Sequence, residues 1–106
     1  MNRRYTRATN NQPIDYTFAP DMHFQLEEMR LHLSAAGEAA NLTVTLVSGV
    51  AAAYNTVLLT QDMTLVTDLH WQPTRPVNFA PGDSIRVEWA NAAARTWGIE
   101  TVWSSI

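Results

Sequence analysis

The chain has 106 residues, of which 46% are hydrophobic and 16% are charged, and its formal net charge at pH 7 is −3. This length suits one domain with one core, and the hydrophobic content argues against a disordered chain. The absence of cysteine excludes disulfides and thiolate chemistry. No apolar run reaches the length of about 18 residues that a membrane-spanning helix needs, and the basic N-terminus lacks the apolar core of a signal peptide.

The first fourteen residues are predicted to form an extended basic arm. Three of the seven basic residues lie in the first seven positions, whereas all ten acidic residues lie at Asp15 or later. The segment has no periodicity and ends at Gln12-Pro13. We therefore expect residues 1–14 to lie on a neighbouring subunit and residues 15–106 to form the domain. Deletion of residues 1–12 is then expected to leave the domain folded.

Alternating apolar and polar residues predict strands through most of the remaining chain. Tyr16 and Phe18 indicate a short first strand. Residues 22–34 fit either a helix or a strand whose phase changes at Glu27-Glu28. We favour the strand, with a β-bulge at the two glutamates, because it places all six apolar residues of the segment on one face.

Four further segments fit short strands. Residues 42–48 alternate strongly and are rich in Val, Leu and Thr, and residues 54–60, 63–71 and 77–79 follow as shorter candidates. A Pro-Gly pair at positions 81 and 82 suits the centre of a type II turn, since proline presets its own φ and glycine accepts a positive φ.

The last two strands have the clearest alternation, over residues 85–89 and 97–103. If they form a hairpin, its register would match aromatic, aliphatic and charged partners together. The predicted pairs are Trp89 with Trp97, Val87 with Ile99, and Arg86 with Glu100.

These segments predict an all-β fold, an antiparallel β-sandwich of jelly-roll type with about eight short strands and an extended N-terminal arm. Trp89, Trp97 and Trp103 share the phase of the apolar strand residues, so we expect them in the core. Trp71, beside a proline-rich break at residues 72–76, is then the tryptophan most suited to the surface.

No pattern in the chain is typical of catalysis or of cofactor binding. The three histidines have no metal-ligand spacing, and the adjacent glutamates Glu27 and Glu28 would share a face only at a bulge. No phosphate-binding loop or nucleophile motif occurs. An acidic body also disfavours nucleic acid. We therefore expect no enzyme activity, no metal and no cofactor, and binding to neither nucleic acid nor membranes.

Several stretches resemble a group of small virion accessory proteins of tailed bacteriophages, sandwich-like proteins of the head. The resemblance covers most of residues 22–103 and concerns framework, turns and core. The stretches are Phe24-Gln-Leu-Glu-Glu-Met-Arg-Leu-His-Leu-Ser34, Tyr54-Asn-Thr-Val-Leu-Leu-Thr-Gln-Asp-Met63, Val66-Thr-Asp-Leu-His-Trp71, Pro81-Gly-Asp-Ser-Ile-Arg-Val-Glu-Trp-Ala-Asn91 and Thr96-Trp-Gly-Ile-Glu100.

This resemblance implies a capsid decoration, or cement, protein on the outer capsid surface of a virion assembled in the bacterial cytoplasm. Its partners would be the major capsid protein and copies of itself, as a dimer or trimer. Candidate partner-binding residues lie in the arm and near the proline-rich break: Arg3, Arg4, Tyr5, Arg7, Trp71 and Arg75.

The main alternative is a receptor- or glycan-binding module of a tail fibre or baseplate. In that case exposed aromatic rings such as Trp71 and Tyr54 would serve as stacking surfaces. Their exposure therefore bears on the choice between the two functions.

Overall fold

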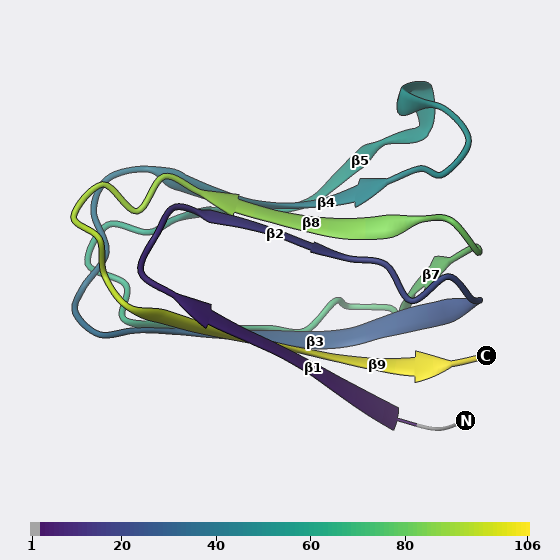
Figure 1. Cartoon of the computed structure of the whole chain (residues 1–106), viewed down its shortest axis with the longest axis horizontal. Coiled ribbons are helices and arrows are strands. Elements are labelled where there is room, and N and C mark those ends of the chain that lie inside the picture. The colour runs from purple at the N-terminus through teal and green to yellow at the C-terminus, as the bar shows by residue number, and fades with distance from the viewer. Residues whose placement is uncertain (1–2) are drawn as a thin grey trace.

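The computed structural model describes residues 3–106, so Met1 and Asn2 of the predicted arm lie outside the described residues. Within residues 3–106 the chain forms nine strands and one 3₁₀ turn, η1 (Ala52–Tyr54), and contains no helix long and apolar enough to cross a membrane. The strands make two antiparallel sheets that face each other (Figure 1). The prediction of an all-β sandwich is confirmed.

The first sheet, called sheet A, is ordered β1-β9-β3-β6, and the short β7 pairs with β3 beside β6. The second, sheet B, is ordered β2-β8-β4-β5. The chain passes repeatedly from one sheet to the other, and the resulting strand orders are those of a jelly roll. The strand bounds are β1 Arg3–Asn10, β2 Ile14–Phe18, β3 Phe24–Leu33, β4 Asn41–Val47, β5 Thr56–Asp62, β6 Asp68–Trp71, β7 Val77–Phe79, β8 Ser84–Trp89 and β9 Trp97–Ser105.

The ambiguous segment at residues 22–34 is a strand, β3, and the predicted bulge is present. Its register with β9 shifts between Leu26 and Glu28, which leaves Glu27 as the extra residue. The buried apolar residues have even numbers before Glu27 and odd numbers after Glu28. One extra residue is therefore required to keep all of them on the same face of the strand. The side chains that β3 buries, on both sides of the bulge, are Phe24, Leu26, Met29, Leu31 and Leu33.

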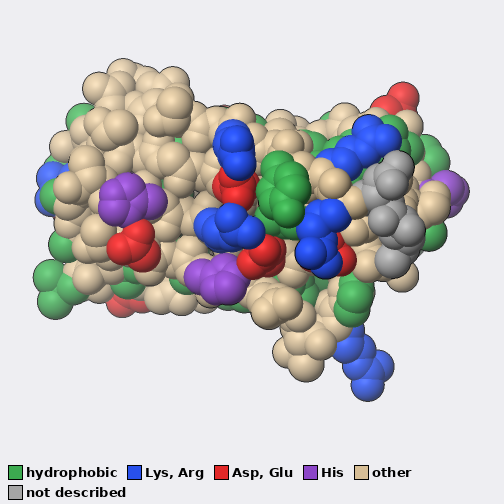
Figure 2. Space-filling model, turned by 90° about the horizontal axis from the view of Figure 1, so that it is seen from below, with side chains coloured by type: hydrophobic (Ala, Val, Ile, Leu, Met, Phe, Trp, Pro, Cys, Tyr) green, Lys and Arg blue, Asp and Glu red, His purple; other side chains and the backbone are tan. Residues whose placement is uncertain are grey.

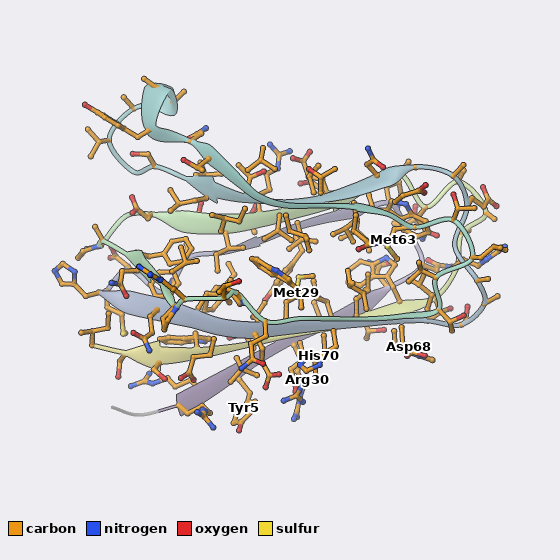
Figure 3. The ribbon with its side chains drawn as sticks, turned by 180° about the vertical axis from the view of Figure 1, so that it is seen from behind. Tyr5, Met29, Arg30, Met63, Asp68 and His70 are labelled. Carbon is orange, nitrogen blue, oxygen red and sulfur yellow. The ribbon has the colours of Figure 1, made fainter. Side chains whose placement is uncertain are left out.

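The core lies between the two sheets and is rich in large rings. Figure 3 shows Met29 and Met63 in the space between the layers. Phe24 stacks on Phe79 with ring centroids 4.5 Å apart and meets Trp103 edge-on. The expected burial of three tryptophans is confirmed, because Trp89, Trp97 and Trp103 are only 3%, 5% and 5% exposed.

The predicted hairpin of the last two strands is wrong. β8 lies in sheet B and β9 in sheet A, so Trp89 pairs with Ile14 of β2, and Trp97 pairs with Asn10 and Leu33. The connection crosses from one sheet to the other. The other two predicted pairs are separated in the same way: Val87 pairs with Tyr16 and Val44, Arg86 with Thr17 and Thr45, Ile99 with Ala8 and Leu31, and Glu100 with Arg7 and Arg30.

A buried asparagine holds this connection in place. Asn91 is 3% exposed and has a positive φ of 49°. Its side-chain amide donates to the carbonyls of Asn11, Gln12 and Arg95, and its side-chain oxygen accepts from the Arg95 amide. These bonds hold the connection against the β1–β2 corner, where it closes one end of the sandwich.

The Pro-Gly turn is confirmed. The Asp83 amide donates to the Ala80 carbonyl over 3.0 Å, and Gly82 has a φ of 90°. Both features match a type II turn. Two predicted strands differ from expectation, since β5 is shifted to Thr56–Asp62 after the 3₁₀ turn and β6 is shorter, beginning only at Asp68.

The expected arm is also corrected by the structure. Residues 3–10 form β1, which pairs along its whole length with β9 at the edge of sheet A. The Trp103 indole N–H donates to the Thr6 hydroxyl, and the Arg4 guanidinium lies 5.4 Å from the centre of the Trp103 ring. β1 therefore covers a core tryptophan, which the lack of apolar periodicity in this segment did not indicate.

We predict that Trp89→Ala lowers the free energy of unfolding by about 3–5 kcal/mol, because it replaces a buried large ring with a methyl group. Urea denaturation of the variant measures this loss. Tyr54→Ala is the control, since the Tyr54 ring is 65% exposed and its removal should leave the midpoint nearly unchanged. An unaltered midpoint for Trp89→Ala would contradict the burial described above.

Deletion of residues 1–12 is expected to destabilise the domain, contrary to the expectation for a free arm. The deletion removes a whole strand of sheet A and the cover of Trp103. Exposing one large side chain alone costs about 1.5–3 kcal/mol. The melting temperature and near-ultraviolet circular dichroism of the truncated chain test this, and native values for both would show that β1 is dispensable.

Candidate interaction surface

The outer face of sheet A carries a regular array of polar side chains. On this face β1, β9, β3 and β6 contribute alternate residues, and the register aligns them in rows that cross the sheet. Figure 2 shows the mixed basic, acidic and histidine side chains of the face, and Figure 3 shows Tyr5, Arg30 and His70 pointing away from the core. One row is Arg7, Glu100, Arg30 and His70, and the next is Thr9, Gly98, His32 and Asp68.

Glu100 lies at the centre of the first row and connects two arginines. Its carboxylate accepts from Arg7 Nε and, over 2.5 Å, from Arg30 Nη1. The Glu100 side chain is only 16% exposed, whereas the Arg7 side chain is 75% exposed. The carboxylate therefore fixes the position of two guanidinium groups, of which that of Arg7 remains largely open to solvent.

The bulge in β3 directs both of its glutamates to this face. Glu27 accepts from Arg3 Nε over 2.8 Å and from the Ser104 hydroxyl over 2.9 Å. Glu28 accepts from Arg30 Nη2 over 2.8 Å, and its other oxygen lies 2.5 Å from His70 Nε2. Adjacent strand residues normally point to opposite faces, so the extra residue of the bulge is what places both carboxylates here.

Both bulge glutamates are held in their charged form. The hydrogen bond from Arg3 lowers the pKa of Glu27, and the hydrogen bond from Arg30, followed by that from His70, lowers the pKa of Glu28. A proton donor at neutral pH would need a raised pKa. The pair therefore has the electrostatics of fixed negative charges within an ion-pair network.

Tyr5 provides the apolar part of the same face. Its ring is 53% exposed, and its cross-strand neighbour on β9 is Val102, which is 1% exposed. Val102 alternates with the inward-facing Trp103, so it belongs to the outer face. An exposed tyrosine flanked by Arg3 and Arg7 is a combination that is enriched at protein interfaces.

The structure brings together three of the six predicted partner-binding residues. Arg3, Tyr5 and Arg7 share the outer face of sheet A through the register of β1 with β9. Arg4 is also exposed but turns the opposite way, over Trp103. Trp71 is only partly buried but packs against the core, and Arg75 is exposed in the loop between β6 and β7.

Sequence reasoning did not find the other residues of the face. They come from three strands that are distant along the chain: Arg30, His32, Asp68, His70, Gly98 and Glu100. The alternation within β9 could have identified two of them, since residues 98 and 100 alternate with the core residues 97 and 99 and therefore point to the outer face. The pairing of β9 with both β1 and β3 had no signal in the sequence.

Two of the three histidines, His32 and His70, lie against carboxylates on this surface. His32 Nδ1 lies 2.5 Å from an Asp68 carboxylate oxygen, and His70 contacts Glu28 as described above. Within residues 3–106, no group of three or more His, Asp or Glu side chains is placed to hold a metal ion.

No protein-family model matches the chain, and no curated protein is similar to it in sequence.

The lowered pKa values of Glu27 and Glu28 predict a dependence of stability on pH. A carboxyl group whose pKa is lower in the folded than in the unfolded state stabilises the fold above its ordinary pKa of about 4.3, and this contribution disappears as the pH falls through the lower, folded-state value. We therefore expect the urea midpoint to fall on acidification below about pH 5. The double variant Glu27→Gln, Glu28→Gln should show a shallower decline.

Glu38→Gln is the matched control for the double variant, because Glu38 lies in the loop after β3 and its closest cation, Arg95, is 3.9 Å away. Its pH profile should follow that of the unchanged protein. Equal slopes for the double variant and the unchanged protein would contradict a stabilising role for the bulge carboxylates.

Proposed function

We propose that this chain is a structural protein of a bacteriophage virion, a capsid decoration protein that binds the outer surface of the assembled capsid. The observation that carries the proposal is the outer face of sheet A, where Tyr5 and a network of paired charges form a rigid, solvent-facing array. The resemblance of its framework stretches to virion accessory proteins supports a virion as the setting of this interaction.

The electrostatics of this face favour protein binding. Its charges are of both signs and already paired, so docking does not require the burial of a lone ion. Paired arginines at the rim of an aromatic contact supply register and specificity. The partner surface proposed here is the major capsid protein.

Repetition on a capsid makes a modest interface sufficient. A decoration protein that binds many equivalent sites gains avidity when neighbouring copies are connected, without any new contact per copy. The free edge of β1 supports such a connection, because the strand order places β9 on only one side of it. A neighbour's strand can add main-chain hydrogen bonds along such an edge, which is consistent with a dimer or trimer.

One observation favours the alternative, a glycan- or receptor-binding module of the tail. The hairpin of β4 and β5 projects from the body with η1 at its tip (Figure 1). It carries Val50, Tyr54 and Val57, which are 85%, 65% and 57% exposed. The ring of Tyr54 would be the stacking surface in that case, whereas Trp71 packs against the core.

Two exposed tyrosines distinguish the two functions. We expect Tyr5→Ala to weaken binding to capsids stripped of this protein by at least about tenfold, the equivalent of about 1.4 kcal/mol and typical of an interface tyrosine. Tyr54→Ala is the matched control and should leave capsid binding unchanged. Sedimentation of the labelled variants with capsids gives both affinities, and unchanged melting temperatures show that the variants are folded.

Immunogold labelling of intact virions tests the location directly. Gold spread over the head agrees with a decoration protein in many copies. Gold confined to the tail tip, together with a binding defect of Tyr54→Ala and none of Tyr5→Ala, would replace the capsid function with the tail function.

A further inference from the structure

A groove crosses the outer face of sheet A between its two rows of side chains. It has a volume of about 630 Å³ and touches four strands of the sheet, β1, β9, β3 and β6. One wall is the row of Arg7, Glu100, Arg30 and His70, and the other is the row of Thr9, Gly98, His32 and Asp68. The second wall is interrupted at Gly98, where the sheet presents only backbone.

The fold does not require a glycine at this position. A Cβ built on Gly98 meets no atom within 4 Å, and Gly98 is not among the residues with positive φ. Glycine in a strand interior also costs about 0.5–1 kcal/mol relative to alanine. Neither packing nor backbone geometry therefore accounts for the missing side chain, and its effect on the molecule is the gap in the surface.

The groove is electrically balanced. Its two arginines, Arg7 and Arg30, are matched by two acids, Glu100 and Asp68, when the histidines are neutral. Both guanidinium groups already bind Glu100. A free anion therefore gains little there, because it would compete with a carboxylate that is in place.

The shape and lining of the gap suit a planar ring. Bare strand backbone at a glycine gives a flat floor that an aromatic side chain can cover, as cross-strand aromatic residues do at strand glycines. Beside the floor lie the Arg30 guanidinium and the His32 imidazole, whose side chains are 49% and 67% exposed. Planar cationic and heteroaromatic groups stack favourably on aromatic rings.

We propose that the groove over Gly98 receives an aromatic side chain of the protein on which this face docks. The inference rests on the proposed function, since it takes the outer face of sheet A as the docking surface. It adds the chemical class of the contact, an aromatic anchor from the partner that lies on the Gly98 backbone between Arg30 and His32.

The test uses a small molecule in place of the partner. The ¹⁵N-labelled protein is titrated with N-acetyltryptophanamide and the amide signals are followed by NMR. We expect saturable shifts centred on Gly98, Thr9 and His32, with a dissociation constant on the order of 1–10 mM for a single anchoring side chain. N-acetylleucinamide, which is apolar but has no ring, should bind at least tenfold more weakly.

Gly98→Val is the decisive variant because it places a branched side chain in the groove, and the Cβ at this position meets no other atom within 4 Å. It should abolish the saturable shifts and leave the melting temperature unchanged or higher, since valine is the better strand former. Gly98→Ala should give an intermediate affinity. Saturation that persists in Gly98→Val, equal binding of the leucine amide, or saturation by a methyl hexoside instead of the aromatic amide would each overturn the proposal.

Capsid binding separates this proposal from the proposed function. If Tyr5→Ala weakens capsid binding but Gly98→Val does not, docking stands and the aromatic anchor is refuted. If the unchanged protein binds the tryptophan amide but not capsids, the capsid function fails while the groove remains a site for an aromatic ring. A loss of capsid binding in both variants supports the two proposals together.

Discussion

The strict alternation of β9 is the constraint on which both faces of sheet A depend. β9 lies between β1 and β3, so its residues define the positions of their neighbours on either side of the sheet. The odd-numbered residues from 97 to 103, among them Trp97, Ile99 and Trp103, point into the core, and the even-numbered residues between them lie on the outer face. A shift of one residue in its register would bury Glu100 and expose the tryptophans. The register that buries the tryptophan rings is therefore the same one that places the polar side chains on the outer face.

The bulge in β3 allows this strand to meet two structural requirements at once. β3 must keep its apolar residues inward along its whole length while its hydrogen bonds follow β9. The extra residue, Glu27, allows the phase to change and places a second carboxylate on the outer face. Each carboxylate then has its own arginine, Arg3 for Glu27 and Arg30 for Glu28. Together with the contact of Glu28 with His70, the resulting network ties together four strands of sheet A, which favours a rigid face suited to binding a preformed surface.

A jelly roll does not by itself indicate a function, because viral capsid proteins and lectins both use it. The surface of the sandwich, by contrast, favours protein binding. One side of the sandwich has ordered, paired charges around Tyr5 and a groove at Gly98, whereas the projecting β4–β5 hairpin has apolar side chains around Tyr54. Of the two, only the sheet A face combines rigidity, charge of both signs and an open gap. Neither packing nor backbone geometry requires the glycine at position 98. On a face that contacts a partner, binding would offset the strand stability that this glycine costs.

The sequence by itself determined the all-β class, the positions of most strands, the bulge at Glu27 and the burial of three tryptophans. These follow from local periodicity, since each strand must turn its apolar residues to one side whatever its neighbours are. Only the tertiary structure decided which strands pair. β8 and β9 are adjacent in the chain and match well as a hairpin, yet they lie in opposite sheets, and the buried Asn91 holds the connection between them at the β1–β2 corner. Residues 3–10 lack an apolar pattern because an edge strand buries little of its own surface. Their position in sheet A could therefore not be predicted from the sequence. The candidate surface depends on the same pairings, because Arg7, Arg30 and Glu100 meet only through contacts between residues 70 or more positions apart.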